Sequence, residues 1–177
     1  LAAAAREPQH QAAQGLALTL HDRTEEAELA FRTALSLNPG LFEACYFFAR
    51  MCFMQGRRAE AIDLFERASA IKPDDYQAPL LVAQVHDDLG HPGRATAARR
   101  LGTVRAEEHL KLHPDDTRAL YMGANGFVAL GEVEKGLAWA RRALDIEPDE
   151  SMVLYNVARI HSLAGQAGPA LDCLERA

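Results

Sequence analysis

Histidine is the residue type in this sequence best suited to metal binding or acid–base chemistry. The chain of 177 residues has seven histidines, and two pairs are closely spaced: His86 with His91, and His109 with His113. Two histidines one helical turn apart, as at 109 and 113, can bind zinc when the protein supplies a third ligand. No third ligand follows at a suitable spacing. The sequence therefore predicts no metal site and no cofactor.

The three cysteines, Cys45, Cys52 and Cys173, lie in apolar stretches. Cys45 and Cys52 are two helical turns apart, a separation of about 10 Å that is too long for a disulfide. We interpret all three as small buried side chains in a reducing compartment, which favours the cytoplasm. Neither a glycine-rich phosphate loop nor a nucleophile elbow is present. These patterns predict a protein that is not an enzyme.

Composition and charge exclude two further classes of protein. The formal net charge is −6, which argues against binding to nucleic-acid phosphates. No apolar run reaches the length of about 18 residues that a membrane-spanning helix needs, so we expect no membrane insertion. Because the chain begins without Met and stops inside an expected helix, we expect it to be part of a longer protein.

An internal repeat is the main signal for the fold. Similar segments end at Pro39, Pro73, Pro114 and Pro148, which are 34, 41 and 34 residues apart. Upstream of the prolines, small and bulky residues recur at spacings of four and three, which places them on one stripe of a helix. The clearest examples are Ala27, Phe31 and Ala34 in the first copy and Ala61, Phe65 and Ala68 in the second.

A second helix precedes each of these, and a turn joins the two. Four of the turns carry a glycine, which adopts the left-handed conformation at low cost, and Asp22 takes that place in the first copy. The glycines are Gly56, Gly90, Gly131 and Gly165. We expect one array over residues 1–177, with repeats at about 8–41, 42–75, 76–116, 117–150 and a truncated copy at 151–177.

The third copy is longer than the others, and its second helix is expected to run from about His91 through Leu112. Seven added residues make nearly two whole turns, so the helix keeps the same buried face. The pattern predicts that Arg99, Arg100 and Arg105 lie on its solvent side, and that Gly102 marks a kink.

With these residues in register, the sequence resembles the tetratricopeptide repeat (TPR) family. The resemblance implies an all-α fold in which about five helical hairpins stack into a right-handed superhelix, the third hairpin having an extended second helix. Residues 110–177 contain His113-Pro114-Asp115-Asp116 before Ala119-Leu120-Tyr121. This part resembles the C-terminal TPR region of bacterial multidomain signalling proteins with nucleotide cyclase, protein kinase or TolB-like domains.

The resemblance also implies where a ligand binds. In TPR proteins the first helix of each hairpin lines a concave groove and exposes two positions one turn apart. Tyrosine there offers amphipathic contact area, and Arg or Asn can bind peptide groups or carboxylates. The matching residues in this sequence are Tyr46, Arg50, Gln84, Tyr121, Asn125, Tyr155 and Arg159.

Two functions follow as expectations. The first is a protein–protein interaction scaffold that binds a protein or peptide ligand in the concave groove. The alternative is a self-association or regulatory module of a larger signalling enzyme of the cyclase or kinase type. In that alternative a homo-oligomer forms through a terminal hairpin or through the long helix of the third repeat.

Overall fold

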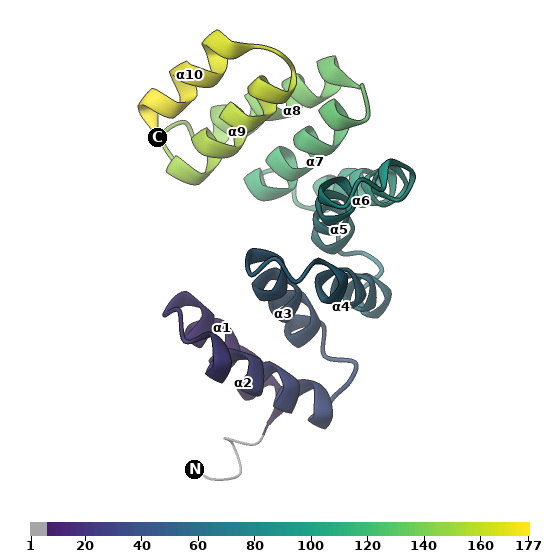
Figure 1. Ribbon diagram of the computed structural model, residues 1–177. Coiled ribbons are helices and arrows are strands. Elements are labelled where there is room, and N and C mark those ends of the chain that lie inside the picture. Colours follow the sequence, from purple (N-terminus) through teal and green to yellow (C-terminus); the bar gives the residue numbers. More distant parts are fainter. Residues whose placement is uncertain (1–6) are drawn as a thin grey trace. The chain divides into compact units, whose positions relative to one another are not determined.

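The computed structural model describes residues 7–177, and these residues form ten α-helices and no strands (Figure 1). The helices pair in chain order as hairpins, which confirms the predicted all-α fold. Their bounds are α1 Pro8–Leu20, α2 Thr24–Leu37, α3 Phe42–Met54, α4 Arg58–Ile71, α5 Gln77–Asp88, α6 Pro92–Leu112, α7 Thr117–Ala129, α8 Val133–Ile146, α9 Ser151–Leu163 and α10 Ala167–Arg176.

The chain divides into two compact units, which we describe separately. The N-terminal unit comprises Leu1–Pro73 together with Gln84–His91, and the C-terminal unit comprises Asp74–Ala83 together with Pro92–Ala177. Helix α5 contributes its first part to the C-terminal unit and its last part to the N-terminal unit. That residues 1–177 form one array stays a prediction.

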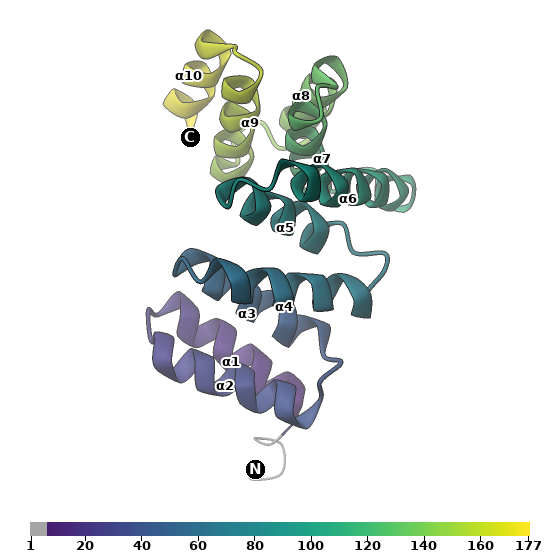
Figure 2. The same cartoon turned by 45° about the vertical axis from the view of Figure 1, so that its right-hand side comes forward.

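In the N-terminal unit, the repeated small and bulky residues form the core. Ala27, Phe31 and Ala34 of α2 are fully buried, and the ring of Phe31 stacks on that of Phe48 from α3 at 5.5 Å between centroids. Phe65 of α4 is also fully buried. The two helices of each hairpin in this unit lie side by side (Figure 2). Small residues let them approach closely, while the phenylalanines fill the space beside the small residues.

The turn inside each hairpin has the predicted left-handed residue. Gly56, Gly90, Gly131 and Gly165 all have positive φ angles, between 69° and 87°. The residue after the glycine donates its N–H to a carbonyl in the last turn of the preceding helix, as from Arg57 to Cys52 at 2.9 Å. This hydrogen bond ends the helix and reverses the chain.

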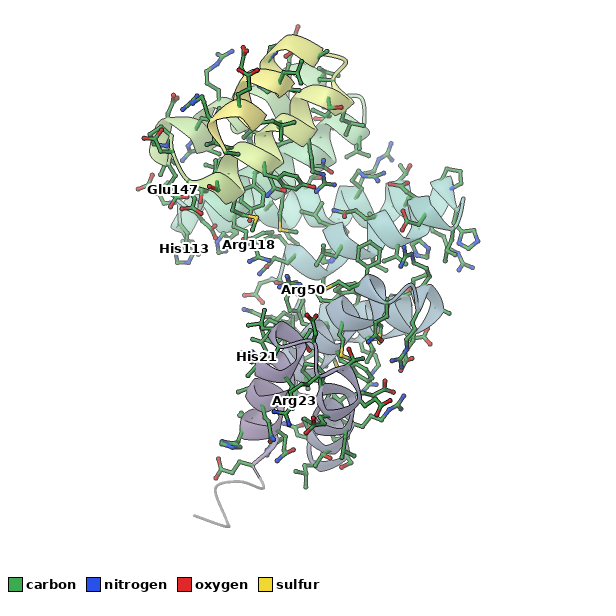
Figure 3. The ribbon with its side chains drawn as sticks, turned by 60° about the vertical axis from the view of Figure 1, so that its left-hand side comes forward. His21, Arg23, Arg50, His113, Arg118 and Glu147 are labelled. Carbon is green, nitrogen blue, oxygen red and sulfur yellow. The ribbon has the colours of Figure 1, made fainter. Side chains whose placement is uncertain are left out.

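Asp22 is the one residue other than glycine with a positive φ among residues 7–177, at 55°. It lies in the α1–α2 turn, and its neighbours in the chain, His21 and Arg23, are labelled in Figure 3. Because a Cβ disfavours this conformation, Asp22→Gly is expected to raise the free energy of unfolding by about 0.5 kcal/mol. Urea unfolding followed by circular dichroism measures the change.

The control for Asp22→Gly is Asp63→Gly. Asp63 is exposed within α4, where glycine is a poor helix former, so this variant is expected to lose stability by a similar amount. If both variants were destabilised equally, backbone strain at Asp22 would be refuted.

In the C-terminal unit, α6 is the extended helix and has 21 residues, whereas α2, α4 and α8 have 14 each. It runs as one continuous helix through Gly102, and the predicted kink there stays a prediction. Gly102 lies in a close contact between two helices, since a Cβ there would lie 2.5 Å from Leu80 Cγ of α5. Arg99 is only 8% exposed, so its predicted place on the solvent side is wrong.

Recurring arginine–carbonyl hydrogen bonds join successive repeats within each unit. Arg67 donates to the Pro39 carbonyl at 3.2 Å, Arg176 donates to the Pro148 carbonyl at 2.8 Å, and Arg142 donates to the Pro114 carbonyl. In each case the arginine follows its proline by 28 residues. The carbonyl near a helix end thus gains a partner from the next hairpin. In the long third repeat, Arg105 donates to the Asp75 carbonyl at 3.1 Å.

Within residues 7–177, every helix is too short or too polar to cross a lipid bilayer.

Candidate functional site

His109 belongs to a hydrogen-bond network at the start of α7, and His113 packs beside it. His109 Nε2 lies 2.7 Å from Asp116 Oδ2, and the Tyr76 hydroxyl donates to the same oxygen at 3.3 Å. Asp116 Oδ1 accepts the Ala119 N–H at 3.0 Å and so caps α7. The His109 and His113 rings are 4.7 Å apart between centroids. Each of these contacts stabilises the junction between α6 and α7.

Asp116 is electrostatically tuned within this network. Burial disfavours its charged form, but the Ala119 N–H, His109 and Tyr76 bind the carboxylate and hold the pKa of Asp116 below its usual value. Burial in turn raises the pKa of the Tyr76 hydroxyl, and the Asp116 charge adds to this effect. Among the described residues, no three His, Cys, Asp or Glu side chains form a group that could hold a metal ion.

Three of the expected groove residues lie in the N-terminal unit. Tyr46 is only 4% exposed, and its ring stacks on Phe42 at 5.5 Å and meets Phe65 edge-on at 6.1 Å. The Arg50 guanidinium lies over the Tyr46 ring at 5.8 Å. Gln84 is half-buried on α5. Tyr46 is therefore a core side chain that offers little surface to a partner.

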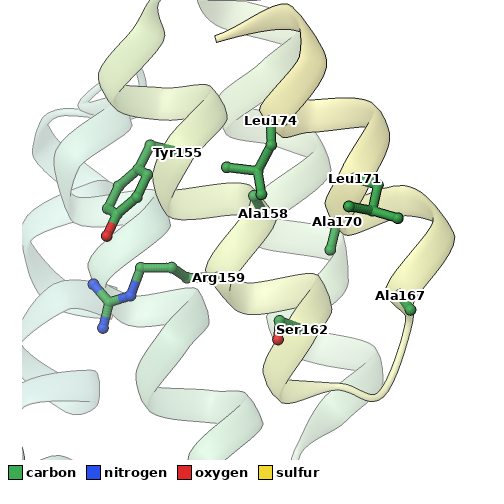
Figure 4. Close-up of a pocket in the computed structure, with 8 residues that line it drawn as sticks. All are labelled: Tyr155, Ala158, Arg159, Ser162, Ala167, Ala170, Leu171 and Leu174. Carbon is green, nitrogen blue, oxygen red and sulfur yellow. The ribbon is translucent and has the colours of Figure 1, made fainter.

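The other four expected residues lie on α7 and α9 in the C-terminal unit. Tyr121 and Asn125 are half-buried, and Tyr121 packs against the core of this unit. Tyr155 is 52% exposed and Arg159 is exposed. The two side chains extend next to each other from α9 (Figure 4). We call these four residues, Tyr121, Asn125, Tyr155 and Arg159, the α7–α9 face.

Tyr155 and Arg159 also border a groove between α9 and α10, which we call the terminal groove. Its volume is about 370 Å³, and its other lining residues are small or apolar apart from Ser162 (Figure 4). Leu171 is 59% exposed and Leu174 is 48% exposed. Arg159 is the one charged residue among those that line the groove, and it has no ion pair within residues 7–177. The full lining is Tyr155, Ala158, Arg159, Ser162, Ala167, Ala170, Leu171 and Leu174.

The α10 side of this groove was missed by sequence reasoning. Leu171 and Leu174 fit the apolar stripe of a second helix, and the residues equivalent to Leu174 in the first two copies, Phe31 and Phe65, are fully buried. The sequence gives no signal that separates a buried leucine at this position from an exposed one.

Comparisons with known proteins agree with the fold of helical hairpins. Residues 18–85 match the family model of the tetratricopeptide repeat. A thermophilic TPR protein of Thermus thermophilus has a TM-score of 0.71 at 21% identity, over 96% of this chain and 91% of that one. The structure of YrrB has a TM-score of 0.59 at 17% identity, over 97% of this chain and 84% of that one. PilF of Pseudomonas aeruginosa has a TM-score of 0.67 at 14% identity, over 96% of this chain and 74% of that one.

A comparison with curated protein sequences gives no match. Identities of 14–21% to the solved structures show the fold alone. The hairpins thus have the fold of solved tetratricopeptide-repeat structures, as the spacing of small residues, turn glycines and prolines predicts.

Proposed function

We propose that this protein is a protein-binding scaffold and that its α7–α9 face binds a peptide or helix. The observation that carries the proposal is the exposed Tyr155–Arg159 pair beside an apolar groove. Tyrosine and arginine are the residues most often found at the energetic centre of protein interfaces. Tyr121 and Asn125 hold the equivalent positions 34 residues earlier, so we expect them on the same face.

The solved structures support a protein partner. YrrB is described as a TPR protein with an unusual peptide-binding site. Placement on helices also suits recognition, because a packed hairpin presents its side chains with little loss of conformational entropy on binding. Tyr46 is left out of the proposed surface because it is buried.

Random peptides displayed on phage, selected on the whole chain, test the α7–α9 face. The triple variant Asn125→Ala, Tyr155→Ala, Arg159→Ala is expected to lose about tenfold or more in affinity for the selected peptides, because it removes the central contacts. Tyr121 is kept because it packs on the core. Fluorescence anisotropy gives the affinities.

Arg141→Ala is the control for this experiment, since Arg141 is an exposed arginine on α8. It is expected to leave the affinities unchanged. Selected peptides that bind the triple variant as tightly as the unchanged chain would show that the ligand binds elsewhere.

A second candidate is the self-association module expected as an alternative, and the exposed Leu171 and Leu174 of α10 favour it. Apolar residues exposed together often mark an interface. Light scattering over a range of concentrations tests it, with a mass that rises toward twice the monomer as the expected result. A constant monomer mass would remove this candidate. A link to an attached signalling enzyme stays a prediction.

A further inference from the structure

The terminal groove has a counterpart elsewhere in the C-terminal unit that shows what fits it. Thirty-four residues before each lining residue, α7 and α8 carry the equivalent positions. There α9 packs against both α7 and α8 and covers the apolar part of the groove, while Tyr121 and Asn125 stay partly exposed. The same arrangement recurs in the N-terminal unit, where α3 packs against both α1 and α2. In this chain a helix is thus what covers a hairpin of this kind.

Exposure at equivalent positions separates the covered groove from the open one. Ala140 of α8 is fully buried, whereas its counterpart Leu174 is 48% exposed. Tyr121 is half-buried, whereas Tyr155 is 52% exposed. The terminal groove therefore presents to solvent the same apolar positions that α9 covers on α7 and α8.

The apolar pattern of α9 defines the shape of a suitable occupant. α9 buries Val153, Leu154, Val157 and Ile160, each at most 1% exposed, on one side of the helix. An occupant with apolar residues at these spacings presents a matching ridge.

Arg159 defines the charge of the occupant. It is the one charged group in the lining, and no carboxylate of residues 7–177 pairs with it. A carboxylate on the occupant would form a charge-assisted hydrogen bond with the guanidinium next to an apolar surface. Helix α1 of a second copy fits this less well, because Pro8–Leu20 contains no acidic residue.

We propose that the terminal groove binds an amphipathic helix that presents a carboxylate to Arg159. This inference rests on the proposed function, since it names the class of partner that the Tyr155–Arg159 pair recognises. The apolar ridge of the helix packs between α9 and α10, and its acidic residue lies at the edge where Tyr155 and Arg159 extend from α9 (Figure 4).

Two synthetic helical peptides test the proposal. Both keep the apolar residues of α9 at the positions of Val153, Leu154, Val157 and Ile160 and have alanine elsewhere, with glutamate on the polar face of one and lysine on that of the other. Binding to the whole chain is measured by fluorescence anisotropy. The acidic peptide is expected to bind about tenfold more tightly than the basic one, despite the net negative charge of the protein.

Variants of the chain then assign the site. Arg159→Glu is expected to reverse the preference between the two peptides, whereas Arg141→Glu, with the same change in net charge but on α8, is expected to preserve it. Leu174→Asn is expected to weaken the binding of both peptides about tenfold, because it interrupts the apolar surface. Its circular dichroism spectrum must match that of the unchanged chain.

Several outcomes would overturn the proposal. Equal binding of the two peptides, or a preference that Arg159→Glu leaves unchanged, removes the role of Arg159. A dimer that Leu174→Asn dissociates shows that a second copy fills the groove. If neither helical peptide binds while the phage-selected peptides still do, the helical partner is refuted and the proposed function stands. If the phage selection also yields no peptide that binds the chain, the proposed function itself is refuted.

Discussion

Gly102→Val is expected to lower the free energy of unfolding of the C-terminal unit by about 3 kcal/mol, the upper end of the usual range for overpacking a core. The Cβ alone would lie 2.5 Å from Leu80 Cγ and 3.0 Å from the Leu80 backbone nitrogen. Leu80 is only 4% exposed and also lies against Gly126 of α7, so it has little room to move. The steric cost exceeds the gain in helix propensity, which is about 1 kcal/mol when alanine replaces glycine and smaller for valine.

Urea unfolding followed by the fluorescence of Trp139 measures this effect in the unit concerned. Trp139 is the only tryptophan, and its ring meets that of Phe127 edge-on at 4.9 Å. Gly93→Ala is the matched control in the same helix, because nothing lies within 4 Å of an added Cβ there. It is expected to leave stability unchanged or slightly raised.

A double variant tests whether Leu80 is the obstacle. Leu80→Ala alone is expected to cost about 2–4 kcal/mol, since it leaves a cavity in the core. Gly102→Ala combined with Leu80→Ala is expected to cost clearly less than the sum of the two single variants, because the second change removes the clash. Strict additivity would show that the destabilisation comes from another contact.

The contact inside each hairpin was predictable from the sequence, because it depends on residues close in the chain. Small residues at spacings of four and three mark the face where two helices meet, and Ala27 and Ala61 are both fully buried there. The left-handed turn needs one permissive residue, which identified Gly56 and even Asp22. The length of α6 followed from the displaced proline alone.

The burial of individual side chains was harder to predict, because several faces of a helix compete for burial. Tyr46 occupies a position that the repeat pattern marks as exposed, yet the neighbouring Phe42 and Phe65 enclose its ring. Arg99 was expected in solvent because it is charged, yet it is buried and its side chain lies close to Gly126. A long arginine stem can pack on an apolar surface, so charge alone does not place it outside.

In the candidate site too, one part was predictable from the sequence and another was not. Tyr155 and Arg159 were identified from their repeat positions, and both are exposed. The groove beside them depends on whether another helix covers Leu171 and Leu174, which no periodicity in the sequence reports. Whether another helix covers a side chain depends on how the helices are arranged in space, whereas the apolar pattern can be read from the sequence of a single helix.

Asp116→Ala is expected to lower the free energy of unfolding by about 2 kcal/mol near neutral pH. Loss of the helix cap accounts for about 1 kcal/mol of this. The remainder comes from His109 and the buried Tyr76 hydroxyl, which lose their shared acceptor. Asp115→Ala, which changes the exposed neighbouring carboxylate, is the control and is expected to change stability by less than about 0.5 kcal/mol.

The effect of Asp116→Ala is also expected to depend on pH, with a definite sign. The pKa of Asp116 in the folded protein is held below its ordinary value of 3.8, so the native state favours the charged carboxylate. Its contribution is therefore fully present above the ordinary value and is lost as the pH falls through the lower folded-state value. Urea unfolding of both proteins between about pH 7 and pH 3 should show the two stabilities converging at the acidic end. A difference that stays constant over this range would show that Asp116 acts through the shape of its side chain and not through its charge.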